Sequence, residues 1–311
     1  MSINLIVPEA RRPHWQERFR FAAPWLEIHD AGQSSEDVDY AFVWLPPPGE
    51  LAAFPNLKVI FSMGAGVDHV FADPHLPDVP IVRIVDEDLT KRMGEWVVLH
   101  VLLHHRQFKQ YDALQRKAEW EELRQPAAAD IRVGIMGLGV IGAHCARLLR
   151  DVGFQVAGWS NSRKAIDGVE SFAGQSELAG FLNRTDVLVN LLPLTPQTKG
   201  VIDKELLSQL AQGGALGGPF LVNGGRGGSQ IEGDIVACLN EGTLLGASLD
   251  VFENEPLSSG SPLWAHPAVF ITPHVAAISD PAFICAYVAG QIERFESGKA
   301  LENVVSPDLR Y

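Results

Sequence analysis

The stretch "RVGIMGLGVIGAHCARLL", residues 132–149, decides the fold. It places Gly137, Gly139 and Gly142 directly after an apolar run and at the start of a helical pattern. In such a unit the glycines permit a tight turn, close approach of a pyrophosphate, and packing of helix on strand, while free N–H groups at the helix start hold the anion. The spacing predicts a dinucleotide site, with a purely structural glycine turn as the alternative. The predicted contacts are Gly137, Leu138, Gly139, Val140, Ile141 and Gly142.

A second apolar run begins eighteen residues after the first glycine of the turn, in "QVAGWSNSRK", residues 155–164. An acid usually follows this strand and bonds the ribose 2′-hydroxyl of NAD. No acid is present here, and the hydroxyl and basic side chains in its place suit a 2′-phosphate. We therefore expect a preference for NADP(H), with NAD(H) possible, unless the basic groups are only solvated loop charges. The residues concerned are Ser160, Ser162, Arg163 and Lys164.

Short apolar runs alternate with helical stretches over most of the chain, which is typical of an α/β protein with parallel sheets. In the first third, strands are predicted at residues 3–8, 25–29, 40–44, 59–62 and 81–85. Six further strands are predicted at residues 132–136, 155–159, 187–191, 220–222, 245–249 and 269–272. Six strands with intervening helices suit a doubly wound, Rossmann-type sheet.

The length of 311 residues favours two domains, because one core rarely serves so long a chain. We expect a smaller, flavodoxin-like α/β substrate domain, which carries catalysis, at residues 1–92 and 278–311. The NAD(P)-binding Rossmann domain would be inserted into it at residues 93–277. A long helix is predicted from residue 90 to about 123, and a last helix, at about 280–297, is expected to return to the first domain.

Composition and charge restrict the class of partner. A net charge of −13 argues against nucleic acid and against an anionic membrane surface, because phosphates would be repelled. The three cysteines, Cys145, Cys238 and Cys285, are far apart and form no disulfide pattern, which favours a reducing, cytoplasmic location. The first residues resemble a strand rather than a signal peptide, and no apolar run approaches the length of a membrane span.

Three later segments follow predicted strands, where open α/β sheets build their sites. They are "LVNGGRGG" with Arg226, "SLDVFENEPL" with Asp250 and Glu255, and "ITPHVAA" with His274. An arginine can bind a carboxylate with two donors, a histidine can carry a proton near neutral pH, and an acid beside it fixes its tautomer. Each residue also has a purely structural interpretation: Arg226 as an ion-pair partner, Glu255 as a surface turn residue, and His274 as a buried, bonded histidine.

Five ordered motifs resemble those of the D-isomer-specific 2-hydroxyacid dehydrogenase family. The motifs are "GIMGLGVIG", "LLPLTPQTKG", "LVNGGRGG", "LDVFENEPL" and "ITPHVAA". Within the family the chain looks most like the short glyoxylate/hydroxypyruvate reductases, because of "VWLPPP", "SMGAGVDHV", "KRMGEWV" and "SPLWAHP". One departure is the link "AQGGALGGPF", which is longer and richer in glycine than is usual; it precedes Arg226 and is expected to leave the site unaltered.

The resemblance implies a role for individual residues. Arg226 would clamp the substrate's carboxylate and keto oxygen, His274 would be the general acid, and Glu255 its partner. Backbone N–H groups around Ala65 and Gly66 would bind the substrate carboxylate, and Trp44 would wall the pocket, with Met63 as a further substrate contact. On the cofactor side, Leu192 and Pro193 would line the adenosine and ribose, Thr198 would reach a phosphate, and Asp250 would hold the nicotinamide carboxamide.

The implied activity is NADPH-dependent reduction of glyoxylate to glycolate and of hydroxypyruvate to D-glycerate. One alternative is a reductase of a bulkier 2-oxo acid such as phenylpyruvate, with Trp44 and Met63 shaping an apolar slot. The other is a dinucleotide-sensing regulator that keeps the fold and acts by binding a partner.

The histidines of "EWVVLHVLLHHRQF" invite a metal site, because His100 and His104 are four residues apart. No carboxylate or cysteine completes a ligand set nearby, so we expect a packing face and no metal. Family members pair through this region, which predicts a homodimer with Trp96 and Phe108 as suitable contacts. The following "KAEWEEL" is predicted to be a solvated helix end.

Overall fold

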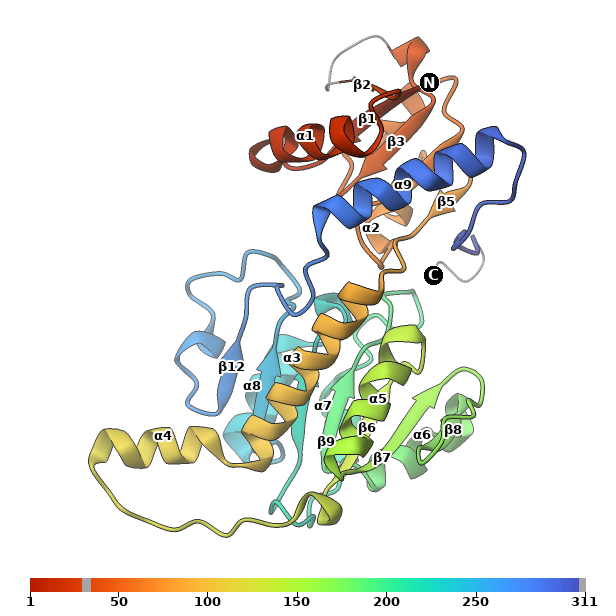
Figure 1. The fold of residues 1–311 in the computed structure, drawn as a ribbon. Helices are drawn as coiled ribbons and strands as arrows, with labels where there is room; N and C mark the ends of the chain where they lie inside the picture. The colour runs from red at the N-terminus through yellow and green to blue at the C-terminus, as the bar shows by residue number, and fades with distance from the viewer. Residues whose placement is uncertain (30–34, 308–311) are drawn as a thin grey trace. The chain divides into compact units, whose positions relative to one another are not determined.

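The computed structural model describes residues 1–29 and 35–307. The chain divides into two compact units. Unit 1 comprises Met1–Leu89 and Ser279–Tyr311, and unit 2 comprises Thr90–Ile278. Each unit is built on its own parallel β-sheet (Figure 1).

Unit 1 contains a five-stranded sheet in the order β2-β1-β3-β4-β5, in which all neighbours are parallel. This is the flavodoxin-like order, which confirms the fold class expected for the smaller domain. The strands are β1 (Ser2–Ile6), β2 (Glu27–His29), β3 (Tyr40–Val43), β4 (Val59–Ser62) and β5 (Ile81–Val82). The helices are α1 (Arg12–Ala22), α2 (Asp68–Phe71) and α9 (Pro281–Glu296), with 3-10 turns at Glu9–Arg11, Ser35–Asp37 and Leu51–Ala53.

Side chains of the unit 1 strands point alternately to the two faces of the sheet, so the core of unit 1 is divided into two apolar clusters. Tyr40 and Phe42 of β3 pack in one apolar cluster with α1 and α9, whereas Ala41 and Val43 belong to a second cluster. Because successive side chains of a strand point to opposite faces, both faces must be covered. The last helix, α9, covers one of them, so the carboxyl-terminal part of the chain completes the amino-terminal unit (Figure 1).

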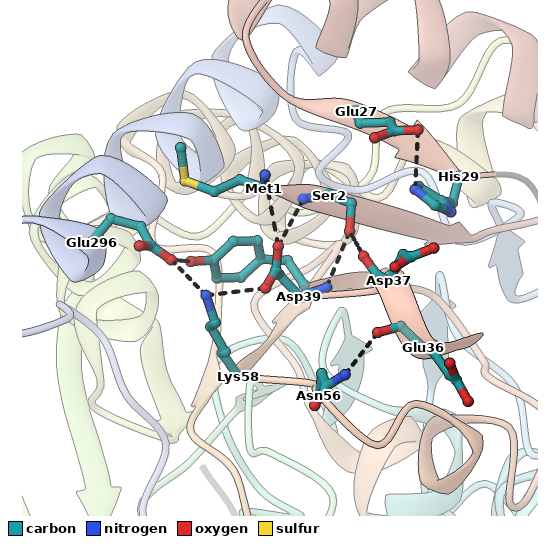
Figure 2. A network of polar contacts seen from close by, with 11 residues as sticks. Met1, Ser2, Glu27, His29, Glu36, Asp37, Asp39, Asn56, Lys58 and Glu296 are labelled. Atoms are coloured by element: carbon teal, nitrogen blue, oxygen red, sulfur yellow. Dashed lines mark hydrogen bonds and ion pairs between the residues drawn. The ribbon is translucent and has the colours of Figure 1, made fainter. Parts of the chain in front are cut away.

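Charged groups at the edge of this core also join the two ends of the chain (Figure 2). The Asp39 carboxylate accepts from the Ser2 amide at 3.0 Å and lies 3.0 Å from Lys58 Nζ. Lys58 Nζ also lies 3.0 Å from Glu296 Oε1 on α9, and the Tyr40 hydroxyl donates to the same oxygen. These hydrogen bonds hold the pKa of Glu296 below its ordinary value. The network therefore ties α9 to the strands that begin the chain.

Unit 2 contains a seven-stranded parallel sheet in the order β12-β11-β10-β9-β6-β7-β8. Its strands are β6 (Arg132–Met136), β7 (Gln155–Ser160), β8 (Glu170–Ala173), β9 (Val187–Asn190), β10 (Phe220–Asn223), β11 (Gly246–Leu249) and β12 (Val269–Ile271). Apart from the added β12, this is the doubly wound Rossmann order, in which the chain reverses direction across the sheet between β6 and β9. The fold class predicted for the cofactor domain is therefore confirmed.

Helices cover both faces of the unit 2 sheet (Figure 1). They are α3 (Glu87–His105), α4 (Phe108–Lys117), α5 (Val140–Val152), α6 (Gly174–Asn183), α7 (Lys204–Ser208) and α8 (Glu232–Glu241), with 3-10 turns at Ala128–Asp130, Gly227–Ser229 and Pro262–Ala265. Helix α5 buries Cys145, Ala146 and Leu149, which repeat at the spacing of one helix face. That face packs with α3 against β6, and this holds the glycine turn at the end of β6.

Two sequence predictions for unit 2 are wrong. Strand β8 was not expected, because its residues are polar or only half-buried and it lies at the edge of the sheet. The helix predicted over residues 90–123 is interrupted where Gln107 adopts a left-handed φ of 55°, and α4 ends at Ala118 with the same conformation. The segment that contains Trp120 is irregular and exposed, and it is not a helix end.

The glycine-rich link before β10 lies at the end of the sheet where β6 and β9 begin. There the buried Asp186 carboxylate binds Arg132 through Nε at 3.0 Å and Nη2 at 2.7 Å. A Cβ at Gly214 would lie 1.9 Å from Asp186 Oδ1, so glycine is required where the link crosses this ion pair. The catalytic candidates follow the opposite, carboxyl ends of the strands, and the link is thus separate from them.

Candidate active site

The glycine turn joins β6 to α5 as its sequence predicts. Gly137 has a left-handed φ of 101°, and a Cβ at Gly142 would lie 1.8 Å from the Gly137 carbonyl oxygen. No side chain caps the start of α5 at Gly139, and among the described residues a Cβ built there would meet no atom within 4 Å beyond those of its chain neighbours. Uncapped N–H groups beside open space are what a pyrophosphate requires, so the turn fits a dinucleotide.

The segment after β9 lies against this turn. A Cβ at Gly137 would lie 3.2 Å from the Leu192 amide nitrogen, which places Leu192 and Pro193 beside the turn. The Thr198 hydroxyl donates to the Pro193 carbonyl at 2.6 Å and accepts from the Thr195 amide at 2.8 Å. Thr198 therefore closes the turn that carries Pro193. Its expected bond to a phosphate stays a prediction.

The loop after β7 carries the four residues expected at a 2′-phosphate. Ser160 Oγ donates to the Ser162 carbonyl at 2.8 Å, so the two serines stabilise the loop itself. The Arg163 guanidinium donates to the Ser171 carbonyl of β8 and forms an ion pair with Glu177 of α6. The Lys164 amide donates to Ser171 Oγ at 2.9 Å. Strand β8 thus holds the loop, and Arg163 has an acidic partner that the sequence did not indicate.

A buried polar cluster holds the backbone at Arg226; we call Asn190, Asn223, Ser229 and Gln230 the amide cluster. Asn190 Nδ2 donates to Asn223 Oδ1 and to Ser229 Oγ, both at 2.9 Å. Asn223 Nδ2 donates to Gln230 Oε1 at 2.7 Å, and Ser229 Oγ donates to the Arg226 carbonyl at 2.6 Å. All four residues are at most 1% exposed. Buried polar groups with this many partners fix a single backbone geometry.

Sequence analysis missed the amide cluster, although a signal was present. Strands β9 and β10 end in the same three letters, "LVN", and the two asparagines occupy paired positions in the sheet. An asparagine at the end of a buried parallel strand needs bonding partners, and two in register can supply them to each other. The repeated asparagine therefore indicated a hydrogen-bonded cluster that holds the residues after these two strands.

His274 and Glu255, which their motifs predict to be a general acid and its partner, lie within hydrogen-bond distance of each other. His274 Nδ1 lies 2.7 Å from Glu255 Oε2, and Glu255 Oε1 accepts from the Phe252 amide at 3.1 Å. Burial opposes ionisation of Glu255, but the bonds from His274 and Phe252 and the charge of Arg226 hold its pKa below the ordinary value. An ionised Glu255 accepts a hydrogen bond from Nδ1 of His274 and so fixes the orientation of the ring.

The backbone at His274 is strained and is held by Asp250. His274 has a left-handed φ of 54°, which costs free energy in a residue other than glycine. The Asp250 carboxylate accepts from the amides of Val275 at 2.9 Å and Ala276 at 3.0 Å, and from Thr272 Oγ1 at 2.6 Å. Asp250 is 1% exposed and therefore stabilises the loop that carries His274. Its expected bond to a nicotinamide carboxamide stays a prediction.

The other candidates lie in unit 1, on the loop after β4 and at the end of β3. Residues Met63, Ala65 and Gly66 are half-buried, and Trp44 follows β3 directly. Within the part of the chain that the structure describes, the amides of Ala65 and Gly66 donate to no acceptor. Neighbouring free N–H groups suit a carboxylate.

The histidines of α3 are part of the core of unit 2. His100 Nδ1 and His104 Nε2 lie 2.8 Å and 2.9 Å from Ser248 Oγ, and desolvation lowers their pKa values to about 4 and about 3. In residues 1–29 and 35–307 there is no group of three or more side chains placed to hold a metal ion. Of the two predicted dimer contacts, Phe108 is 55% exposed, but Trp96 is 8% exposed and its indole donates to Thr272. Trp96 is thus mainly a core residue, contrary to its expected role.

A histidine with an acidic partner can protonate the carbonyl oxygen of a substrate, and a nearby arginine can stabilise the negative charge that develops on that oxygen. Beside a sheet built for a dinucleotide, these groups suit hydride transfer to a carbonyl and define a nicotinamide-dependent oxidoreductase.

Comparison with known proteins specifies the family. The model "D-isomer specific 2-hydroxyacid dehydrogenase, NAD binding domain" matches residues 98–276. The chain therefore belongs to the D-isomer-specific 2-hydroxyacid dehydrogenase family, as its motifs predicted.

Individual relatives match over the whole chain. A protein of Enterobacter sp. (strain 638), named glyoxylate/hydroxypyruvate reductase A, is 42% identical over 318 residues and covers 100% of both chains. The crystal structure of an NADPH-dependent glyoxylate/hydroxypyruvate reductase from Sinorhizobium meliloti, in complex with NADP and sulfate, is 48% identical. It has a TM-score of 0.94 and covers 100% of this chain and 99% of its own. A probable 2-hydroxyacid dehydrogenase from Rhizobium etli, in complex with NADP, HEPES and L(+)-tartaric acid, is 46% identical with a TM-score of 0.93 and the same coverage.

No helix among the described residues is long and apolar enough to cross a membrane.

Proposed function

We propose that this protein is an NADPH-dependent reductase of small 2-oxo acids, which converts glyoxylate to glycolate and hydroxypyruvate to D-glycerate. The observation that carries the proposal is the pairing of His274 with Glu255 at 2.7 Å, in a chain that matches glyoxylate/hydroxypyruvate reductases over its full length. This pairing also argues against a dinucleotide-sensing regulator, which has no need of a general acid.

The roles of the unit 2 residues follow from their chemistry. A bound NADPH supplies the hydride. Arg226 binds the anionic substrate and stabilises the negative charge that develops on the C2 oxygen, a task that local positive charge must perform in a protein of net charge −13. His274 donates its Nε2 proton to that oxygen, while Glu255 accepts a hydrogen bond from Nδ1 and orients the ring. The amide cluster and Asp250 keep Arg226 and His274 at fixed backbone positions.

We propose that the loop of unit 1 binds the substrate carboxylate. The free amides of Ala65 and Gly66 support this role, and Trp44 supplies an apolar wall with Met63 as a further contact. Backbone donors that need no side-chain ordering can select for a carboxylate whatever the rest of the acid is. Trp44 would then restrict the size of the group attached to the keto carbon.

The cofactor contacts extend this proposal to residues 137–142, to Leu192 and Pro193, and to the loop after β7. The glycine turn and the uncapped start of α5 would hold the pyrophosphate. Ser160, Ser162, Arg163 and Lys164 would accept the 2′-phosphate, because they offer hydroxyl groups and positive charge where an acid would repel it. Arg163 must then exchange at least one of its bonds to Ser171 and Glu177 for a bond to the phosphate.

A substrate panel tests the activity. We expect the purified chain to oxidise NADPH with glyoxylate and with hydroxypyruvate, and to show a lower kcat/KM with pyruvate and with phenylpyruvate. With glyoxylate and with hydroxypyruvate, kcat/KM should be lower with NADH than with NADPH. A higher kcat/KM for phenylpyruvate would favour the bulkier 2-oxo acid as the substrate class, and no oxidation with any acid would contradict a reductase.

A double substitution tests the cofactor contacts. We expect Ser160→Asp with Arg163→Ala to reduce the preference for NADPH over NADH by roughly 10-fold or more, because the change removes one cation and adds a carboxylate. The dissociation constants of both dinucleotides, measured by nicotinamide fluorescence, provide the readout. An unchanged preference would show that these residues do not read the 2′-phosphate.

We propose further that the protein is a cytoplasmic homodimer that pairs through α4 and the segment after it. Helix α4 buries none of its own residues, Phe108 is 55% exposed, and Trp120 is 104% exposed. The three cysteines are free and buried, which suits a reducing compartment. Phe108→Ser with Trp120→Ser should yield a monomer in light scattering, whereas Phe21→Ser, at a residue 87% exposed in unit 1, should not change the mass.

A further inference from the structure

Ser62, the last residue of β4, is the centre of a polar relay beneath the proposed substrate loop. Its side chain is 0% exposed. Ser62 Oγ lies 3.3 Å from the Gly64 amide, 3.1 Å from the Gly66 carbonyl oxygen and 3.2 Å from His69 Nε2. A hydroxyl can accept two hydrogen bonds and donate one, so these three partners account for all of its capacity.

The direction of each bond follows from one backbone group. The Leu45 amide donates to His69 Nδ1 at 3.3 Å, and a backbone N–H can only donate, so Nδ1 carries no proton. The ring proton of a neutral His69 is then on Nε2 and points to Ser62 Oγ. Since Ser62 Oγ accepts from His69 and from the Gly64 amide, its own hydrogen is donated to the Gly66 carbonyl.

The same histidine contacts Trp44. The two ring centroids are 4.8 Å apart with an interplanar angle of 53°. Leu45, which follows Trp44, has a left-handed φ of 51°, and the bond from its amide to His69 holds this unfavourable turn. The loop also packs directly on the indole, because a Cβ at Gly64 would lie 3.3 Å from the Trp44 ring.

From this geometry we propose that His69 is a positioning residue that fixes both the carboxylate-binding loop and the Trp44 wall through a neutral, Nε2-protonated relay to Ser62. This rests on the proposed function of the loop. His69 is 8% exposed, and the proposed role acts through the loop and Trp44. Its effect is to hold the amides of Ala65 and Gly66 at a set distance from Trp44, and it thereby determines which 2-oxo acids are accepted.

Two substitutions separate the halves of the relay. His69→Asn keeps an acceptor for the Leu45 amide but loses the donor to Ser62, whereas His69→Gln places an amide donor near the position of Nε2. We expect the KM for glyoxylate to rise roughly 10-fold in His69→Asn and less than about 3-fold in His69→Gln, as suits the loss of one hydrogen bond that orders an anion site. In both variants kcat and the dissociation constant of NADPH should stay within about 2-fold of the unmodified protein.

A matched control and a second variant guard against a general loss of structure. His29→Asn makes the same change at another buried histidine of unit 1, on edge strand β2, and should leave the KM unchanged. Ser62→Ala should raise the KM as His69→Asn does, and the double variant should raise it no further, because the two residues act through one relay. Equal KM values in all variants, or additive effects of the two changes, would overturn the proposal.

Nitrogen NMR of protein labelled at histidine provides a readout that does not depend on turnover. The signal that disappears in His69→Asn should belong to an Nε2-protonated tautomer, and the Nδ1-protonated tautomer would overturn the relay. The affinity for oxalate, a small dianion without a reducible keto group, should fall in His69→Asn together with the rise in KM. If the unmodified protein reduced no 2-oxo acid, the proposed function would be wrong. If it reduced them and the KM values of the His69 and Ser62 variants were unchanged, only the relay would be wrong.

Discussion

The amide cluster of unit 2 and the relay of unit 1 both support groups that we assign to anion binding, but they are built differently. The cluster joins two adjacent strands and the loop of Arg226 through side chains that do not titrate. The relay joins one strand end to the four-residue helix α2 through a histidine, with bonds of 3.1 to 3.3 Å. Many short, buried bonds between strands stabilise a structure more than a few longer bonds do. We therefore expect substitutions in the amide cluster to lower the stability of the protein more than substitutions in the relay.

The largest effect should come from His274, the proposed general acid of unit 2. We expect His274→Ala to lower kcat by about 1,000-fold, because no other proton donor replaces the ring. Binding of NADPH, measured by fluorescence, should stay within about 2-fold, since the glycine turn is unaltered. His75→Ala, at an exposed histidine, is the control. A loss of less than about 10-fold in kcat would contradict the role of His274 as the general acid, and unit 2 would then not carry the chemistry.

The next effect tests how much the amide cluster contributes to the free energy of unfolding. Asn223→Leu removes the partner of the Gly225 amide and one hydrogen bond from each of the side chains of Asn190 and Gln230. We expect a decrease of about 3 kcal/mol in the free energy of unfolding, as buried groups lose hydrogen bonds. Urea titration followed by circular dichroism measures it, with the exposed Asn183→Leu as control. A smaller decrease than Ser62→Ala produces would reverse our ranking of the two supports.

A smaller effect should depend on pH. Because the pKa of Glu255 is lowered from the ordinary 4.5, its ionised form stabilises the folded protein fully above that value, and this stabilisation disappears as pH falls through the lowered pKa. Glu255 is 36% exposed, so solvent screening limits the contribution to about 1 kcal/mol or less. Glu255→Gln should therefore be less stable than the unmodified protein at pH 7, and the difference should shrink as pH falls below 4.5 and Glu255 is protonated in the folded protein. A difference in melting temperature that does not shrink on acidification would contradict this.

The smallest effect concerns cofactor selection in unit 2. Glu177→Gln removes the charge that pairs with Arg163, and the affinity for NADPH should rise by less than about 3-fold, because exposed ion pairs contribute little. The affinity for NADH should not change. In an Arg163→Ala background the same substitution should have no effect on NADPH, and a persistent effect there would mean that Glu177 acts by another route.

Local patterns in the sequence predicted most strands of both units. The fourth strand of unit 1 and the first strand of unit 2 were predicted with the bounds observed, Val59–Ser62 and Arg132–Met136, because continuous apolar runs bounded by polar or glycine residues are clear signals. Strand β8 was not predicted because an edge strand needs only one apolar face and therefore gives a weaker signal in the sequence. The break at Gln107 escaped because its surroundings contain no glycine or proline to indicate a left-handed residue.

The sequence by itself determined the dinucleotide turn, the fold class and the family, because each depends on residue types at fixed short spacings. Only the tertiary structure decided which groups support them. The bonds of Asn190 to Asn223, of Asp250 to the His274 loop and of Ser62 to His69 depend on neighbours in space and on the direction of single N–H groups. The pairing of Arg163 with Glu177 likewise required β8 and α6 to be placed beside the loop. Spacing along a chain specifies a local turn, whereas a hydrogen bond between distant residues is specified by the packing of the elements that carry them.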